Sequence, residues 1–310
     1  MPAVADRDVV DGEASDLGAR RSSKFALEDA HRRILASSAY DHPISKLHEL
    51  PDGARIAHDD LGSGRPVVLI HGVSMSRRFF ERNVDGLAER FRVINVDLRG
   101  HGESPAHEGG HTVAQYARDV RHLIDALGLD GAVLVGWSMG SLVIWDLIRQ
   151  FGTGGLAGHV VVSQGPSDLK QPDWEHGGFT VEGLHRTLAA AQADYRGVME
   201  RLVLAMLRDE PSTTEHDLLL RETLRVGANA GTCILLDQSL QDYRDVVGTY
   251  ELPTLLVWGR DEKLVPLAGG EWLAERIPGE LVVFERSGHC PMWEEPARFT
   301  QVVGDWAAGL

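Results

Sequence analysis

The stretch that decides the fold is Gly136-Trp137-Ser138-Met139-Gly140, which joins a short apolar run to a helical pattern. A sharp strand-to-helix turn here would hold Ser138 at strained backbone angles with its hydroxyl pointing outward, as in a nucleophile elbow. Gly136 and Gly140 lack the Cβ atoms that would clash in such a turn. Unpaired N–H groups at the start of the helix would favour an anion bound beside the serine. The stretch therefore predicts a serine nucleophile at the end of a central strand.

Other short apolar runs, rich in valine, alternate with helical patterns along the chain. They lie at residues 66–70, 91–96, 132–135, 159–162, 255–258 and 281–284, after a hairpin at residues 46–50 and 55–59. Continuous apolar strands separated by helices are typical of a parallel sheet that is covered on both faces. The sequence therefore predicts an α/β fold with a mostly parallel central sheet.

About ninety residues without a strand pattern separate the runs at 159–162 and 255–258. That length is too great for an ordinary crossover, and apolar stripes at helical spacing fill it. We therefore expect an inserted helical cap over residues 168–250, with the core formed by residues 48–167 and 251–310. Such a cap would cover a site at the carboxyl ends of the strands with aliphatic groups.

The first residues differ from the rest in composition. Residues 1–22 combine many charges with few large apolar side chains, which is typical of a disordered tail. Ser23 is a suitable N-cap for a helix over residues 24–37, because apolar positions then recur at helical spacing. Residues 23–47 are therefore expected to form a helical extension outside the core.

The overall composition limits the classes of function. The chain has 310 residues, 43% of them hydrophobic, and a formal net charge of −15, which argues against nucleic acid or an anionic membrane as a partner. Cys233 and Cys290 lie far apart and without metal-ligand spacing, so no disulfide framework, metal site or cofactor is predicted. The start of the chain has no apolar segment typical of an export signal, and a cytoplasmic protein is expected. The oligomeric state is not indicated.

A serine needs a base to remove its proton and a carboxylate to orient that base. Asp261 follows the run at 255–258 and His289 follows the run at 281–284, so both are placed at carboxyl ends of strands. We therefore expect a Ser138, Asp261, His289 triad, in the chain order known for α/β-hydrolases. The neighbouring Glu262 is expected to point away, and Asp168, which follows the preceding strand, is the alternative acid.

Five motifs occur in order along the chain: His71-Gly72, the segment from Asp97 to Ser104, the serine stretch, Gly259-Arg260-Asp261 and Ser287-Gly288-His289. With these motifs the chain resembles α/β-hydrolase-fold enzymes of the esterase and lipase type, over residues from about 48 to the end. Within that family it is most similar to bacterial arylesterases and to the cofactor-free chloroperoxidases and perhydrolases, which share the Gly-x-Ser-Met-Gly form and a helical cap.

The resemblance implies an oxyanion hole formed by the backbone N–H groups of Met139 and Val73. Perhydrolase-like relatives carry an aromatic residue and a proline after the His-Gly pair. Val73 and Ser74 stand there instead, which argues against peracid chemistry.

The implied function is hydrolysis of a small carboxylic ester or lactone with apolar groups, through an acyl-enzyme on Ser138. Trp137, Met292 and Trp293 are expected to line the substrate pocket, because they neighbour the triad in sequence. Acyl transfer, C–C hydrolysis or cyclisation on the same triad is the alternative. A ligand receptor that kept the fold without turnover is a further alternative from another class.

One segment matches a different motif. Residues 107–111, His-Glu-Gly-Gly-His, fit the zinc-protease pattern HExxH, which needs a helix to place both imidazoles on one face. The two glycines just before the Thr112 cap predict a loop instead. His71 and His101 are expected to hydrogen-bond loop backbone near the serine rather than to act as bases.

Overall fold

The computed structural model describes residues 45–310, which form one compact unit. The predicted tail at 1–22 and the predicted helix at 24–37 lie outside the described residues. Strand β1 begins at Lys46, so the core starts before the expected boundary at residue 48.

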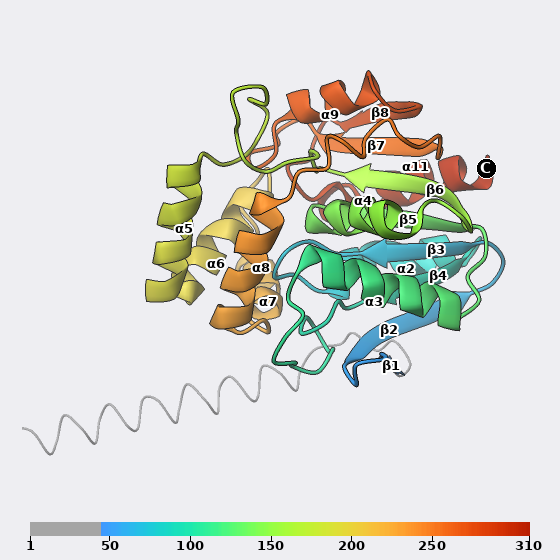
Figure 1. Ribbon diagram of the computed structural model, residues 1–310, viewed down its shortest axis with the longest axis horizontal. Coiled ribbons are helices and arrows are strands. Elements are labelled where there is room, and N and C mark those ends of the chain that lie inside the picture. Colours follow the sequence, from blue (N-terminus) through green and yellow to red (C-terminus); the bar gives the residue numbers. More distant parts are fainter. Residues whose placement is uncertain (1–44) are drawn as a thin grey trace, which may run out of the picture. The chain divides into compact units, whose positions relative to one another are not determined.

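The central sheet has eight strands in the order β1-β2-β4-β3-β5-β6-β7-β8 (Figure 1). They are β1 (Lys46–Glu49), β2 (Arg55–Gly62), β3 (Pro66–Ile70), β4 (Arg92–Val96), β5 (Ala132–Trp137), β6 (Leu156–Val162), β7 (Thr254–Gly259) and β8 (Gly279–Phe284). Strand β2 pairs antiparallel with β1 and β4, and every other pairing is parallel. The predicted α/β fold with a mostly parallel sheet is confirmed.

Two sets of helices accompany the sheet. The core set is η1 (Arg77–Phe80), α2 (Glu81–Ala88), α3 (Val113–Ala126), α4 (Met139–Phe151), α9 (Leu267–Ala274), α10 (Pro291–Glu294) and α11 (Pro296–Ala308). The second set, called the cap helices below, is α5 (Val181–Ala193), α6 (Tyr195–Met206), α7 (Thr213–Thr223) and α8 (Ala228–Leu240).

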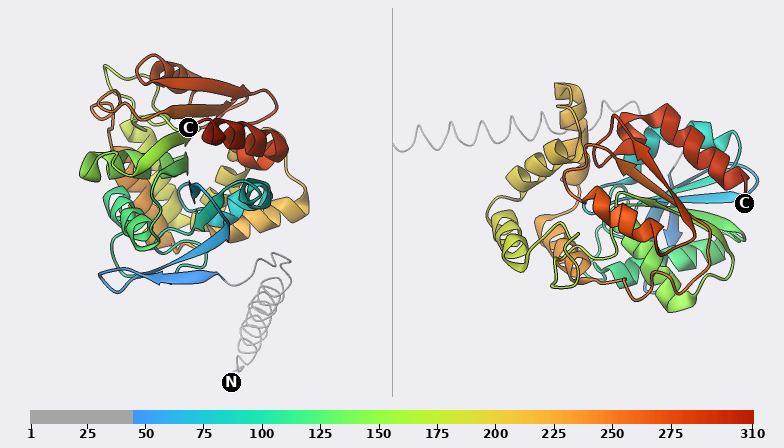
Figure 2. Two further views of the ribbon diagram at one scale, coloured as in Figure 1. Left: turned by 90° about the vertical axis from the view of Figure 1, so that its right-hand side faces the viewer. Right: turned by 90° about the horizontal axis from the view of Figure 1, so that it is seen from above.

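Both faces of the sheet are buried, and the strands show why. Successive side chains of a strand point to opposite faces. In β3, Val68 and Ile70 pack in a cluster with α3 and α4, whereas Val67 and Leu69 pack in a second cluster with α2 and α11. Helices accordingly lie on both sides of the sheet (Figure 2). A strand buried in this way must be apolar at every position, which explains the continuous runs in the sequence.

The cap helices lie between β6 and β7 in sequence, beyond the carboxyl ends of β3, β5 and β6 (Figure 1). Helix α5 packs on α6 and α8, and α6 packs on α7. All four fall within the predicted cap at 168–250. Within residues 45–310, no helix is long and apolar enough to cross a membrane. The cytoplasmic location stays a prediction.

Helix α4, which follows the turn at the end of β5, packs closely against the end of β3 at Gly140. This contact can be tested by adding a side chain there. A Cβ on Gly140 would lie 2.2 Å from the carbonyl oxygen of Ile70 and 3.1 Å from that of His71. Because both atoms are backbone, we expect Gly140→Ala to lower the free energy of unfolding by roughly 1–3 kcal/mol. Denaturant unfolding measures this loss. Gly154→Ala is the matched control, since a Cβ there meets nothing within 4 Å. Equal losses in the two variants would contradict the steric explanation.

A buried histidine predicts a pH dependence of stability. His159 lies in the core, and within the described chain neither ring nitrogen has a hydrogen-bond partner. Burial lowers the pKa of His159 from 6.5 to about 3. Between these values the unfolded chain binds a proton that the folded chain excludes, so stability falls as the pH is lowered, by about 1.4 kcal/mol per pH unit.

We expect His159→Phe to reduce the slope of unfolding free energy against pH by about that amount between roughly pH 4 and 6. The comparison uses slopes rather than absolute stabilities, because the larger ring also changes packing. Urea unfolding at several pH values measures the slope for the parent protein and for the variant. A slope equal to that of the parent protein would show that His159 does not stay neutral in the folded state.

Candidate active site

Ser138 lies between β5 and α4 in the predicted sharp turn. Its backbone has φ 53° and ψ −126°, a left-handed φ that is costly for a residue with a side chain. The Ser141 hydroxyl donates to the carbonyl oxygen of Gly136 at 2.6 Å and closes the turn. A Cβ on Gly136 would lie 2.5 Å from the Ser141 nitrogen, so glycine is required there. Close backbone packing around Ser138 therefore maintains its strained backbone conformation.

His289, in the loop after β8, is held from three sides. Its Nδ1 lies 2.8 Å from Oε2 of Glu262. Its backbone N–H donates to the carbonyl oxygen of Met206 at the end of α6, at 2.8 Å. Its carbonyl oxygen accepts a hydrogen bond from the Trp137 indole at 2.8 Å. The core, the cap helices and the residue before Ser138 together determine where this imidazole lies.

Glu262 is the carboxylate that contacts the histidine, contrary to the expectation that it points away. Its Oε1 accepts hydrogen bonds from the backbone N–H groups of Leu264, at 2.8 Å, and Val265, at 3.2 Å. Its side chain is 1% exposed. Burial alone would raise the pKa of Glu262, but the His289 imidazole and the two N–H groups outweigh it and lower the pKa. The group is therefore built to stay ionised beside the imidazole.

Asp261, the acid expected from the sequence, lies elsewhere, and that assignment is corrected. Its side chain is 46% exposed and pairs with Arg208 at 3.1 Å. Its backbone N–H donates to the carbonyl oxygen of Ser287 at 3.0 Å, which continues the pairing of β7 with the histidine segment. This pairing holds the Asp261 side chain at the surface, and the chain turns inward one residue later. The sequence shows two adjacent acids at the end of this strand, so Glu262 could have been considered as an equal candidate for the carboxylate that contacts His289.

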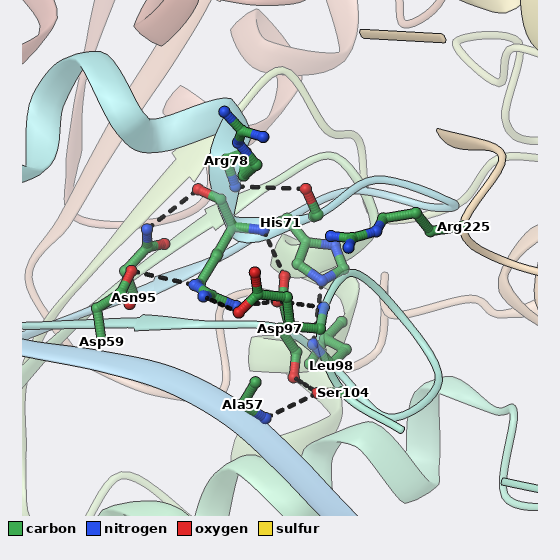
Figure 3. A network of polar contacts seen from close by, with 12 residues as sticks. Ala57, Asp59, His71, Arg78, Asn95, Asp97, Leu98, Ser104 and Arg225 are labelled. Carbon is green, nitrogen blue, oxygen red and sulfur yellow. Dashed lines mark hydrogen bonds and ion pairs between the residues drawn. The ribbon is translucent and has the colours of Figure 1, made fainter. Parts of the chain in front are cut away.

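The loop after β3 lies against the serine. A Cβ on Gly72 would be 3.1 Å from the Cβ of Ser138. The His71 Nδ1 donates to the carbonyl oxygen of Gly72 at 2.8 Å. Its Nε2 accepts from the Leu98 N–H at 3.0 Å (Figure 3). Burial lowers the pKa of His71 to about 4, so the ring is neutral near neutral pH. His71 therefore braces loop backbone, as predicted. His101 likewise bonds a backbone oxygen, that of Arg99, at 3.0 Å.

A buried ionic network supports this loop (Figure 3). Asp97 accepts hydrogen bonds from the backbone N–H groups of Arg77, at 2.7 Å, and Glu103, at 2.8 Å. The Arg77 guanidinium pairs with Asp97 and with Asp59, the latter at 3.1 Å. Asn95 donates to the Arg77 carbonyl oxygen at 3.0 Å. The segment from Asp97 to Ser104 thus anchors the chain just beyond the loop after β3.

The two expected oxyanion donors, Met139 and Val73, belong to the two segments next to the serine. Met139 is the first residue of α4, so its N–H has no carbonyl one turn earlier to which it could donate. Val73 follows Gly72 in the loop against Ser138 and lines the same cavity as the serine. Their role as donors to an oxyanion stays a prediction.

A cavity of about 590 Å³ lies over these residues and is lined by both Ser138 and His289. The cap helices contribute apolar groups such as Ala190, Val198 and Leu202. Trp137 lines the cavity, and its contact with a substrate stays a prediction. Met292 and Trp293 do not appear among the described residues that line the cavity, which corrects the prediction for both. They are buried in the cluster on the α2 and α11 face, because α10 turns them toward the sheet.

Two other predictions concern polar groups outside the proposed triad. Asp168, the alternative acid, lines the cavity but bonds to Gln164 and Gln238 rather than to the imidazole. Residues 107–111 form a loop, as predicted, and the His111 ring donates to the His107 carbonyl oxygen at 2.7 Å. In the part of the chain that the structure describes, no group of three or more histidine, cysteine or acidic residues could hold a metal.

Known proteins are similar to this chain in sequence and in fold. The model of the alpha/beta hydrolase family matches residues 67–302. The 2-hydroxy-6-oxononadienedioate/2-hydroxy-6-oxononatrienedioate hydrolase 1 of Dechloromonas aromatica is 30% identical over 84% of this chain and 94% of its own length. The pimeloyl-[acyl-carrier protein] methyl ester esterase of Chromobacterium violaceum is 28% identical over 80% of this chain and 96% of its own.

The esterase EaEST from Exiguobacterium antarcticum has a similar solved structure. Its TM-score is 0.82 at 23% sequence identity, covering 86% of this chain and 100% of that protein. This likeness supports the fold. With the family match over most of the described residues, the chain belongs to the alpha/beta hydrolase family. The predicted resemblance and the predicted hydrolase class are confirmed.

The corrected acid is directly testable. We expect Glu262→Gln to reduce kcat for an aryl ester by about 10³–10⁴-fold, since the imidazole loses the carboxylate that selects its tautomer. Asp261→Asn removes the same charge one residue earlier, at the surface, and is expected to change kcat by less than about threefold. Steady-state hydrolysis of p-nitrophenyl acetate measures both. A large loss in Asp261→Asn with little change in Glu262→Gln would restore the acid expected from the sequence.

Proposed function

We propose that this protein hydrolyses a carboxylic ester or lactone with apolar groups, through an acyl-enzyme on Ser138. The observation that carries the proposal is that Ser138 and His289 line one cavity while His289 bonds to the buried Glu262. This combination supplies a nucleophile, a base and an orienting carboxylate. The acid of the proposed triad is therefore Glu262 in place of Asp261.

The roles follow from the contacts. Because the ionised Glu262 carboxylate can only accept, the Nδ1 of His289 carries the proton and Nε2 is free to act as the base. In the proposed reaction, Nε2 takes the proton of the Ser138 hydroxyl as its oxygen attacks the carbonyl carbon. The imidazolium then protonates the leaving alcohol, while Glu262 stabilises its positive charge. Water attacks the acyl-enzyme in the second half and releases the acid.

The tetrahedral intermediate carries a negative oxygen that needs donors. We assign these to the backbone N–H groups of Met139 and Val73. Met139 begins α4, so the helix adds a favourable dipole at this point. A pair of fixed N–H groups needs no rearrangement as charge develops, and one such donor is typically worth roughly 10²–10³ in rate.

The cavity wall supports a substrate with apolar groups. Aliphatic side chains of α5 and α6 form much of the lining, including Ala191, Leu202 and Ala205. The name of the Chromobacterium relative, a methyl ester esterase, supports an ester as the scissile group.

One observation favours a second candidate. The Dechloromonas relative, the more similar of the two by identity, is named as a hydrolase of an oxo-dienedioate rather than of an ester. Two exposed cations, Arg186 of α5 and Arg201 of α6, line the cavity and would suit an acidic substrate group. Hydrolysis of a C–C bond beside a ketone on the same triad is therefore the alternative. Comparing the products formed from ester and oxo-acid substrates separates the two.

The nucleophile is tested by Ser138→Ala. We expect this variant to lose at least about 10⁴-fold in kcat for short-chain aryl esters, because no other group can form the acyl-enzyme. Labelling by a fluorophosphonate should disappear with it. Ser212→Ala changes a serine that caps α7 outside the cavity and should keep both the activity and the label. Full hydrolysis by Ser138→Ala would show that the mechanism is wrong.

A further inference from the structure

One carboxylate in the cavity wall is not used by the proposed chemistry. Asp168 follows β6, is 7% exposed and lines the cavity together with Gln164 and Gln238. Its Oδ1 accepts a hydrogen bond from the Gln164 amide at 2.7 Å, and its Oδ2 accepts one from the Gln238 amide at 2.9 Å. Among residues 45–310, two neutral amides therefore hold this acid in a mostly apolar cavity and no ion pair is formed on either oxygen, although His289 lies close enough to act on its charge.

The residue on α8 that holds this acid has an unsatisfied polar atom of its own among the described residues. Gln238 lies on α8 and is 5% exposed, and its Oε1 is buried without a hydrogen-bond partner in the part of the chain that the structure describes. The amide group of Gln238 thus serves Asp168 while its own oxygen stays unsatisfied, which is unfavourable in a buried position. Burial raises the pKa of Asp168 to about 6, which leaves the group ionised near neutral pH.

A purely structural role does not require this charge. A neutral asparagine could link the loop after β6 to α8 through the same positions, without the penalty of burying a carboxylate. An ionised carboxylate offers about four acceptor positions, and the two amides fill two of them. The cavity wall therefore keeps spare acceptor capacity beside the proposed nucleophile.

We propose that Asp168 determines substrate specificity by accepting a hydrogen bond from a hydroxyl or amide N–H group of the substrate whose ester is attacked by Ser138. The inference rests on the proposed function and extends it. The substrate class becomes a hydroxy- or amido-substituted ester or lactone, apolar along most of its length and with one donor group. Gln164 and Gln238 act as positioning residues that aim and stabilise the carboxylate.

The expected effect is a preference between matched substrates. A hydrogen bond to a buried charged group corresponds to about 10–100-fold in kcat/KM when the substrate donor is removed. The preference is the ratio of kcat/KM for two esters measured on the same protein. A change that slows the reaction of both esters equally therefore leaves this ratio unchanged. A residue that acted only through His289 would change both esters equally.

The test uses two series of small aliphatic esters, with a hydroxyl at successive carbons of the acyl part or of the alcohol part. Each is paired with the same ester lacking the hydroxyl, and a third series pairs amide N–H compounds with their N-methyl analogues. Acid release gives kcat/KM for every pair. For the parent protein we expect a ratio of about 10–100 at the position that reaches Asp168. The third series distinguishes a hydroxyl from an N–H donor.

Asp168→Asn should bring that ratio close to one. Gln238→Met removes one of the two donors that hold the carboxylate and should lower the ratio by a smaller factor. This variant provides a second test if Asp168→Asn folds poorly. Asp173→Asn is the matched control: it makes the same chemical change on a nearby exposed residue that pairs with Arg244, and it should keep the parent ratio.

Binding to the Ser138→Ala protein separates the two proposals, because it needs no turnover. Calorimetry with the best donor-bearing ester and its analogue should show the same preference, and it should be absent from the Ser138→Ala, Asp168→Asn double variant. A preference in binding without hydrolysis by the parent protein would overturn the proposed function alone. Equal ratios in parent and Asp168→Asn, or no preference at any position in the three series, would overturn the role of Asp168.

Discussion

The site depends on backbone segments that pack closer than any side chain would allow. Gly140 brings α4 against the Ile70 carbonyl oxygen, where a Cβ would lie at 2.2 Å, and Gly259 brings the end of β7 against the Gly288 carbonyl oxygen, where a Cβ would lie at 1.9 Å. Such contacts fix the loops that carry Ser138 and His289 without relying on flexible side chains. The positions of the proposed nucleophile and base are therefore set by the edge of the sheet rather than by each loop alone.

The fold could be predicted because its cause is present in the central strands. Strand β3 is buried on both faces, so each of its residues is apolar and the run can be recognised without knowing its neighbours. The strained turn at Ser138 could also be predicted, since the requirement for glycine at position 136 comes from Gly140 and Ser141 in the same turn, although the requirement at Gly140 comes from the distant Ile70. The assignment of an oxyanion hole to the loop after β3 rests on family resemblance and stays a prediction, although Gly72 does approach Ser138 closely.

The acid and two pocket residues could not be predicted from the same pattern. Whether Asp261 or Glu262 faces the histidine depends on the pairing of Asp261 with Ser287 and on Arg208, a residue of the segment after α6. Neither partner is adjacent in sequence. Met292 and Trp293 follow His289 directly, but α10 turns them into the core, because a short helix redirects side chains within a few residues.

The hydrogen bond from the His289 N–H to the Met206 carbonyl oxygen joins the proposed base to the end of a cap helix. The same cap helix lines the cavity with Leu202 and Ala205. A ligand that packs under α6 and steadies it therefore also steadies the imidazole, and a displacement of α6 disturbs it. In the proposed mechanism, filling the cavity and ordering the base would therefore be thermodynamically linked, so each would favour the other.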